Sequence, residues 1–532
     1  MSAYGLTDID QADHNLQLMA GDPHTRRQLA AILPILLESI SHTANPDQAL
    51  NHWERLLYGV TRSNFLEYLR SSPRMLDLLC TIFGNSDSLA FTIIRDPMLV
   101  FWLAEEDALS KPPKRARVEQ SLREQVGHLT VKELKLEVLR RFRRREMLRI
   151  GVRDLLRLAN VLETTASLSD LASILIEAAY EIVDADLRRQ YGVPMHKNRQ
   201  GQWVETGFVV LGMGKLGGHE LNYSSDVDLI YVYESHEGET RLPRGKDVGK
   251  PAGVGISNEE YFEILSRELT KALVEPTKEG YLFRVDLRLR AEGSVGQLAR
   301  SLDEYDKYYS TRGQVWERLA LLKAWPIAGS PEVGKRFVRV VRPFVLASSG
   351  AKPEVQQCLA IVQDVRSVKE RIDAKMADRG HERRNVKLGV GGIREIEFLV
   401  QTVQVLAGRR LPGLLDRSTL GSLVRLQRAG ILSTKQQAQL TGAYNFLRNL
   451  EHKLQMVHDL QTHALPAQAE ELERCAIRMG YNGGNRSAVL RQFQADYDKY
   501  TMVVHDIFQS FFENPKASSV FNAILRKTNA AR

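Results

Sequence analysis

The stretch between residues 206 and 233 constrains the fold of this 532-residue chain more than any other. TGFVVLGMG (206–214) and DLIYVY (228–233) are short apolar runs that predict two strands. Gly212, Gly214 and Gly217 spell the G-x-G-x-x-G pattern of dinucleotide-binding folds, which need a crossover helix before the next strand. Here the next strand begins after about a dozen residues, too few for that crossover. We therefore predict a strand, a glycine turn, a short helix and then the second strand.

Two aspartates stand at the start of the second strand, in SSDVDLI. Side chains at i and i+2 of a strand point the same way, so Asp226 and Asp228 should project together. YLFRVDLRLR (281–290) alternates strictly and predicts another strand, whose Asp286 joins the pair if the two strands are neighbours. Three such carboxylates repel one another unless cations lie among them, and two Mg²⁺ ions about 3.5–4 Å apart are the usual arrangement in nucleotidyl transfer. The alternative is one capping Asp and one surface Asp paired with an arginine.

The glycine turn ahead of the aspartates, LGMGKLGG (211–218), has the composition of a phosphate-binding turn. Its backbone N–H groups are predicted to face the phosphates of a nucleotide, with Ser224 and Ser225 as further donors. The alternative is a tight turn that binds nothing. The neighbouring carboxylates favour the phosphate role.

The rest of the chain reads mainly as helices. We predict an α+β, mostly helical fold with three domains: an N-terminal helical region (1–195), an α/β domain with a small mixed sheet (196–330) and a C-terminal helical bundle (331–532). Residues 239–255, rich in Gly, Pro and Lys, predict a mobile loop within the middle domain.

Composition narrows the class of protein. A net charge of +8, from 73 Lys and Arg against 65 Asp and Glu, is too mild over this length to argue for nucleic acid. No apolar run approaches the ~20 residues that span a bilayer, and the polar N-terminus does not resemble a signal peptide. Cys80, Cys358 and Cys475 are far apart, which predicts buried free thiols in a reducing cytosol. We therefore expect a cytoplasmic protein with no nucleic-acid and no membrane partner.

The glycine turn, SSDVDLI and the third aspartate together resemble the nucleotidyltransferase fold of the DNA polymerase β type. Longer stretches more specifically resemble the family of glutamine synthetase adenylyltransferase/adenylyl-removing enzymes. These stretches are RRFRRREMLRI (140–150), GKLGGHELNYSSDVDLIYVY (214–233), RVDLRLRAEG (284–293), WERLALLKAWPIAG (316–329), VKLGVGGIREIEFLVQ (386–401) and YNFLRNLEHKLQMVHDLQTHALP (444–466).

That resemblance implies a reaction. The family is bifunctional: one nucleotidyltransferase domain removes AMP from a tyrosine of glutamine synthetase by phosphorolysis, releasing ADP, and the other attaches AMP from ATP. This chain has a single D-x-D constellation after an N-terminal helical region, so the resemblance implies the adenylyl-removing half. The partners it implies are glutamine synthetase, a PII signalling protein, phosphate, and ADP or ATP.

The resemblance also implies roles for individual residues. Asp226, Asp228 and Asp286 match the catalytic, metal-binding carboxylates, which would hold two Mg²⁺ or Mn²⁺ ions. The phosphate-facing turn and the basic positions near it are matched by Gly214, Lys215, Gly217, Gly218, Ser225, Arg288, Arg290 and Lys323. Ala291 and Trp325 depart from the family, which usually has Pro after RLR and Arg after KA, so fine substrate contacts are expected to differ.

Other readings stay open at this point. The rival functions are adenylylation of glutamine synthetase from ATP, and a catalytically silent docking module for glutamine synthetase or PII. The arginines of residues 140–148 predict a solvated helix face, or else a surface for an acidic partner. In residues 391–401, Arg394, Glu395 and Glu397 face either the cleft or solvent. The histidines of residues 452–463 lack zinc-ligand spacing.

Overall fold

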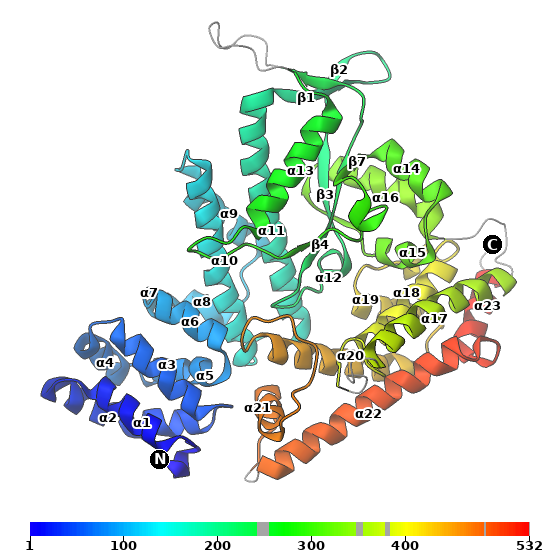
Figure 1. Ribbon diagram of the computed structural model, residues 1–532. Coiled ribbons are helices and arrows are strands. Elements are labelled where there is room, and N and C mark those ends of the chain that lie inside the picture. The colour runs from blue at the N-terminus through cyan, green and yellow to red at the C-terminus, as the bar shows by residue number, and fades with distance from the viewer. Residues whose placement is uncertain (242–254, 347–354, 378–383, 484–485, 531–532) are drawn as a thin grey trace, which may run out of the picture.

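The computed structural model describes residues 1–241, 255–346, 355–377, 384–483 and 486–530 (Figure 1). It confirms the predicted α+β class: the chain is mostly helical, and two small sheets lie between an N-terminal and a C-terminal group of helices. Most of the predicted loop at 239–255 lies outside the described residues. Its first residues form a short strand, β5 (Glu239–Arg241).

The N-terminal helices pack around one apolar core that includes Trp53 and Phe83, both fully buried. Proline at a first helical position and capping side chains fix several helix starts, as in α2, where Asp22 accepts hydrogen bonds from the backbone N–H groups of His24 and Thr25. The helices are α1 (Ile9–Ala20), α2 (Pro23–Ser41), α3 (Pro46–Tyr58), α4 (Arg62–Ser71), α5 (Pro73–Asn85), α6 (Asp87–Arg95), α7 (Met98–Leu103), α8 (Glu106–Ser110), α9 (Arg115–Gly127), α10 (Lys132–Leu155) and α11 (Val161–Tyr191).

The arginines of helix α10 do not form a solvated face, so that prediction is wrong, whereas a surface for an acidic partner stays a prediction. Arg140 is buried and donates to the backbone carbonyls of Ala272 and Glu275. Arg144 pairs with Glu279, and Arg143 stacks on Phe283. These arginines hold α10 against the turn that leads into the third aspartate.

The larger sheet is mixed and has the strand order β6-β4-β3-β8, with β7 also paired to β4. Strand β3 runs antiparallel to both β4 and β8, whereas β6 and β7 run parallel to β4. An antiparallel β3–β4 pair joined by a four-residue helix confirms the predicted strand, turn, helix and strand, and excludes a dinucleotide-binding crossover. The elements are β3 (Phe208–Gly212), α12 (Gly214–Gly217), β4 (Val227–Tyr233), β6 (Val285–Asp286), β7 (Ala299–Ser301) and β8 (Trp325–Gly329).

Helices cover both faces of this sheet, so β3 is buried throughout and β4 is buried and apolar from Leu229 onward. Leu229 and Tyr231 pack with α11 and α13 (Asn258–Val274), while Ile230 and Val232 pack with α14 (Leu302–Thr311) and α16 (Pro331–Val345) on the opposite face (Figure 1). A smaller antiparallel sheet, in the order β2-β1-β5, contains β1 (Val193–Lys197) and β2 (Trp203–Glu205).

The strand predicted over residues 281–290 is shorter than expected. Only Val285 and Asp286 are in β6. After Asp286 the chain turns, because its side chain accepts the backbone N–H of Arg288 and the N–H of Arg290 bonds to the carbonyl of Leu287. The alternating pattern therefore reflects a short strand followed by a turn, in which Arg288 is exposed and Arg290 is buried, and not a long strand.

The C-terminal helices form a second large core beside the sheet, shown yellow to red in Figure 1. Ile393, Ile396, Val400 and Val403 are buried in it, as the sequence predicted. The helices are α15 (Val315–Leu321), α17 (Val355–Ala377), α18 (Ile393–Ala407), α19 (Thr419–Arg428), α20 (Thr434–Gln455), α21 (Ala469–Met479), α22 (Arg486–Phe512) and α23 (Ser519–Ala530). The predicted boundaries at 195 and 330 stay a prediction, since α11 and α16 on either side of them both pack on the sheet.

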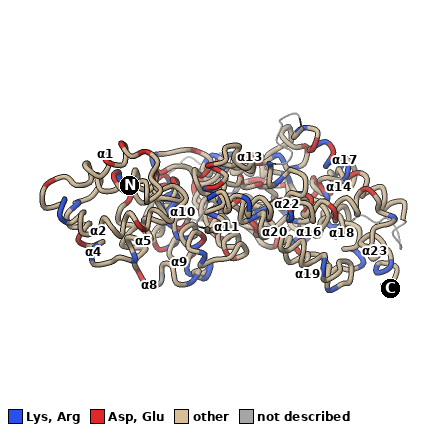
Figure 2. Tube along the Cα trace, turned by 90° about the horizontal axis from the view of Figure 1, so that it is seen from below, with Lys and Arg blue, Asp and Glu red and all other residues tan. Residues whose placement is uncertain are grey.

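Three further observations concern membrane-spanning helices, the distribution of charge and the cysteines. In the part of the chain that the structure describes, no helix is long and apolar enough to span a bilayer. Lys and Arg are interspersed with Asp and Glu along the tube in Figure 2, consistent with a mild net charge. Cys80, Cys358 and Cys475 are buried free thiols, as predicted.

Candidate active site

The strand pairing brings the predicted aspartates together. Asp228 on β4 lies directly opposite Asp286 on the parallel strand β6, and residues paired in this way project from the same face of a sheet. Asp226 immediately precedes β4, two residues before Asp228. The structure thus places all three carboxylates at one end of β4.

A cavity of about 400 Å³ opens at this point, between the sheet and the C-terminal helices. Of the predicted site residues, those that line it are Asp226, Asp228, Asp286, Gly214, Lys215, Ser225, Arg288 and Lys323. Gly217, Gly218 and Arg290 lie outside the lining. Arg290 instead donates to the backbone carbonyls of Leu287, Ser294 and Gly296, so it holds the turn after β6 in shape.

The opposite wall of the cavity comes from helices that the motif did not include. Its apolar part consists of Trp316, Leu319 and Ala320 on α15, Val368 and Ile372 on α17, and Phe398 on α18. Its charged part consists of Lys387, Arg394 and Glu397. Arg394 and Glu397 therefore face the cleft, whereas Glu395 pairs with Lys369 away from it. The cavity is lined by both charged and apolar side chains, which suits a nucleotide.

Two of the three carboxylates are turned toward arginines. Nε of Arg284 donates to Asp226 Oδ1 at 2.9 Å, and Nε of Arg288 donates to both oxygens of Asp286 at 3.0 Å. The hydrogen bonds from Arg288 lower the pKa of Asp286. Within the described residues, no group of three or more His, Cys, Asp or Glu side chains is gathered closely enough to hold a metal ion as it stands.

The pKa of Asp228 is shifted in the opposite direction from that of Asp286. Burial, reinforced by the nearby charge of Asp286, raises its pKa from 3.8 to about 6. Its carboxylate has no hydrogen-bond or ion-pair partner among the described residues. A carboxylate in that state is stabilised by any cation that enters the cavity.

The glycines act mainly by allowing close approach. A Cβ at Gly214, whose φ is +52°, would lie 2.5 Å from Asp228 Oδ2, so only glycine lets the turn pass over this carboxylate. A Cβ at Gly217 would lie 1.9 Å from the backbone oxygen of Lys323. Gly214 therefore shapes the cavity, and Gly217 packs the turn against the segment before β8.

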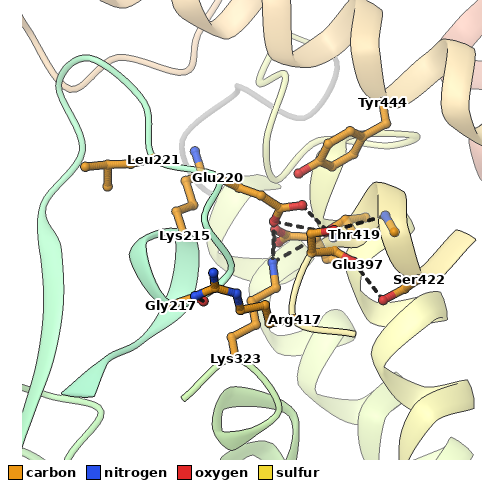
Figure 3. Close-up of polar contacts among 12 residues, drawn as sticks. Lys215, Gly217, Glu220, Leu221, Lys323, Glu397, Arg417, Thr419, Ser422 and Tyr444 are labelled. Atoms are coloured by element: carbon orange, nitrogen blue, oxygen red, sulfur yellow. Dashed lines mark hydrogen bonds and ion pairs between the residues drawn. The ribbon is translucent and has the colours of Figure 1, made fainter. Parts of the chain in front are cut away.

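The predicted basic residues Lys215 and Lys323 have partners that the sequence did not indicate. Lys323 Nζ is buried between Glu220 Oε2 at 2.9 Å and Glu397 Oε1 at 3.2 Å, beside Thr419 (Figure 3). Lys215 Nζ donates to both oxygens of Glu451 at 2.8 and 2.9 Å. Burial alone would raise the pKa of Glu397, but Lys323 and Arg394 outweigh it and lower that pKa to about 2.

This buried network fixes the glycine turn onto the C-terminal helices. Glu220, just after α12, also accepts the backbone N–H of Thr419 at the start of α19. Arg448 on α20 donates to the backbone oxygen of Glu220 at 2.6 Å. The site is therefore held by residues about 200 positions apart along the chain.

The remaining histidines are structural partners. His463 pairs with Glu451 at 2.7 Å, and His452 lies 3.1 Å from Asn222 Oδ1. His458 pairs with Asp87 at 2.7 Å.

Comparison with known proteins gives two family matches. Residues 76–340, which contain the sheet and its aspartates, match the model described as glutamate-ammonia ligase adenylyltransferase. Residues 366–512, which contain the helices opposite the aspartates, match the model described as GlnD PII-uridylyltransferase.

Curated relatives match across both regions and share one name, bifunctional glutamine synthetase adenylyltransferase/adenylyl-removing enzyme. The relative from Hahella chejuensis is 36% identical over 426 residues, covering 80% of this chain and 41% of the relative. That from Nitrosococcus oceani is 35% identical over 442 residues, covering 83% and 43%. That from Rhizobium meliloti is 40% identical over 348 residues, covering 64% and 33%. The chain thus spans about two fifths of the length of the first two relatives.

Proposed function

Because the chain belongs to the glutamine synthetase adenylyltransferase family, a family of nucleotidyltransferase enzymes, we propose that it removes AMP from an adenylylated tyrosine of glutamine synthetase in the cytoplasm. Inorganic phosphate is the attacking group and ADP is the product. The observation that carries the proposal is the meeting of Asp226, Asp228 and Asp286 at a cavity that is also lined by apolar side chains. The apolar side chains would contact the adenine, and the aspartates would lie beside the α-phosphate.

The residues present fit a divalent metal. Carboxylate oxygens are the hard ligands that Mg²⁺ and Mn²⁺ prefer, and Asp228 is unpaired among the described residues. Arg288, whose side chain is 77% exposed, can move away from Asp286 without breaking packed structure. Asp226, Asp228 and Asp286 would hold two such ions. When bound, these ions neutralise charge that develops on the transferring phosphoryl group.

The reaction balances without a further reactant. An oxygen of inorganic phosphate attacks the α-phosphorus, a new P–O–P bond forms, the bond from phosphorus to the tyrosine oxygen breaks, and that oxygen takes a proton. The chain's own residues position the reactants. Gly214 keeps the turn close to the α-phosphate, and the helices opposite the sheet exclude water from the nucleotide.

The test is phosphate-dependent ADP release from adenylylated glutamine synthetase. The 532-residue chain should release ADP, Asp226→Asn should lose at least about a hundredfold in rate because electrostatic stabilisation is usually the largest contribution, and exposed Asp303→Asn should keep the rate. Wild-type rates in Asp226→Asn would refute the site assignment.

The rival reaction shares the same site. In a parallel assay, the chain is incubated with ATP and unmodified glutamine synthetase. Incorporation of AMP without phosphate-dependent release would reverse the proposed direction. If the chain binds glutamine synthetase but shows neither activity, it is a docking module.

A PII protein is proposed as a further partner. The match of residues 366–512 to a PII-uridylyltransferase supports this assignment. PII should co-sediment with the chain, whereas an unrelated protein of similar size and charge should not. Equal recovery of both proteins would reject the assignment.

A further inference from the structure

The charged groups around the cavity are nearly all neutralised by one another. Asp226 pairs with Arg284, Asp286 with Arg288, Lys215 with Glu451, and Lys323 with Glu220 and Glu397. Within the described residues, two charged lining groups have neither a hydrogen bond nor an ion pair. One is the carboxylate of Asp228, discussed above, and the other is the ammonium group of Lys387.

Lys387 is held rigidly by its backbone while its side chain is left free. Its N–H donates to Asn385 Oδ1 at 3.0 Å, and its carbonyl oxygen accepts the N–H of Arg394 at 2.9 Å. The loop then closes at Gly391, whose φ of +68° and contact with the backbone of Thr501 admit no side chain. A loop this well fixed gives the ammonium group a defined position at the cavity wall.

An unpaired ammonium group in such a place is costly. Lys387 is half-buried beside Arg394, and both burial and that neighbouring positive charge lower its pKa. Arg394 is paired with Glu397 at 3.3 Å and lies over the ring of Phe398, but its Nε is buried without a hydrogen-bond partner among the described residues. An anion between the two side chains would pair with the ammonium group of Lys387 and accept a hydrogen bond from Nε of Arg394.

The other basic candidates do not serve this purpose. Lys215 and Lys323, which the sequence suggested as phosphate-facing, are each neutralised by buried carboxylates at 2.9 Å or less. The N–H groups at the start of α18 are also occupied, because those of Ile393 and Arg394 bond to loop carbonyls. The unpaired positive charge on this wall is therefore that of Lys387, and beside it lies Arg394, which shares Glu397 with Lys323.

We propose that Lys387 and Arg394 form an oxyanion subsite that binds the attacking inorganic phosphate opposite the aspartates. The inference rests on the proposed function, because phosphate must approach an already anionic phosphodiester. Two cations on the wall facing Asp228 reduce that repulsion and orient the phosphate toward the α-phosphorus. ATP-dependent transfer to tyrosine needs no such subsite, since its nucleophile is a neutral hydroxyl.

Two measurements test the subsite. The first is direct binding of inorganic phosphate to the chain, followed by ³¹P NMR line broadening with no glutamine synthetase present. The second is the KM for phosphate in ADP release. Lys387→Met should weaken phosphate binding and raise that KM by about tenfold to a hundredfold, as expected for losing one charge-assisted hydrogen bond. The KM for adenylylated glutamine synthetase should stay within about twofold, because in this proposal Lys387 contacts the attacking phosphate and not the adenylyl group.

Two further variants distinguish the loss of phosphate binding from misfolding. Lys387→Arg keeps the charge and should retain most of the phosphate affinity. Lys335→Met, an exposed lysine on α16 paired with Glu332, is the matched control and should change nothing. Equal phosphate binding in Lys387→Met and wild type would overturn the subsite, whatever the enzyme's activity. Phosphate binding that depends on Lys387, with no ADP released, would keep the subsite and reject the proposed function.

Discussion

Replacing Asp228 with asparagine should abolish activity and at the same time stabilise the metal-free fold. The substitution keeps the shape of the side chain and removes a charge that is half-buried and has no partner among the described residues. Burial and the charge of Asp286 raise the pKa of Asp228 from 3.8 to about 6. A carboxyl group whose pKa is raised by folding stabilises the native state only while it is protonated, so its contribution is lost as pH rises through 6.

The size of the effect follows from that pKa. Each pKa unit corresponds to about 1.36 kcal/mol, so the ionised carboxylate costs the native state about 3 kcal/mol at pH 8. At pH 5 the cost is about 1.6 kcal/mol, because the native group is then largely protonated. The stability advantage of Asp228→Asn over wild type should therefore grow by about 1.4 kcal/mol between pH 5 and pH 8. Packing effects of the substitution do not depend on pH and cancel in this difference.

Urea unfolding in EDTA at pH 5, 6.5 and 8 measures this difference. Asp303→Asn on α14 is the control, because it removes an exposed carboxylate that does not line the cavity. The difference in unfolding free energy between this variant and wild type should not change with pH. Adding Mg²⁺ should stabilise wild type more than Asp228→Asn, because a cation favours the ionised form. An advantage of Asp228→Asn that is constant or shrinks with pH would show that the carboxylate is not destabilised by its surroundings.

Two further substitutions test the packing behind the site. Gly217→Ala places a Cβ 1.9 Å from the backbone oxygen of Lys323 and should cost at least about 1–3 kcal/mol in urea unfolding. Gly218→Ala, whose nearest contact would be 3.1 Å, should cost less, and equal costs would contradict the close approach. Glu451→Gln leaves Lys215 buried without its carboxylate and should cost about 3–5 kcal/mol. An unchanged unfolding midpoint would show that this ion pair does not hold the glycine turn.

The local part of the site could be predicted from the sequence because its spacing admits few structures. The short connection between residues 214 and 228 forces an antiparallel neighbour, and the position of Asp286 in an alternating run puts it beside Asp228. The same alternation misled the prediction of strand length. In residues 281–290, Arg284 and Arg288 alternate because they pair with carboxylates and end the strand.

The partners of the lysines could not be predicted. Lys215 and Glu451 are separated by 236 residues, and nothing in the neighbourhood of either one indicates the other. The prediction that the arginines of α10 face solvent was wrong for a related reason. A run of like charges usually faces solvent, yet Arg140 donates hydrogen bonds to backbone carbonyls 132 and 135 residues away. Buried ion pairs depend on tertiary packing, which a single sequence does not display.

The functional unit therefore extends beyond the motif that reveals it. Residues 196–330 alone contain the three aspartates and the glycine turn, but Lys215 would lose Glu451 on α20, and Lys323 would lose Glu397 on α18 and keep Glu220. The subsite of Lys387 and Arg394 would also be absent. A lysine that is largely removed from water and has no carboxylate is costly, and a phosphate without a cation has no defined position. We infer that the segment after residue 386 completes the site chemically, because it supplies carboxylates to two lysines of the site and adds Lys387 and Arg394 as the proposed anion subsite.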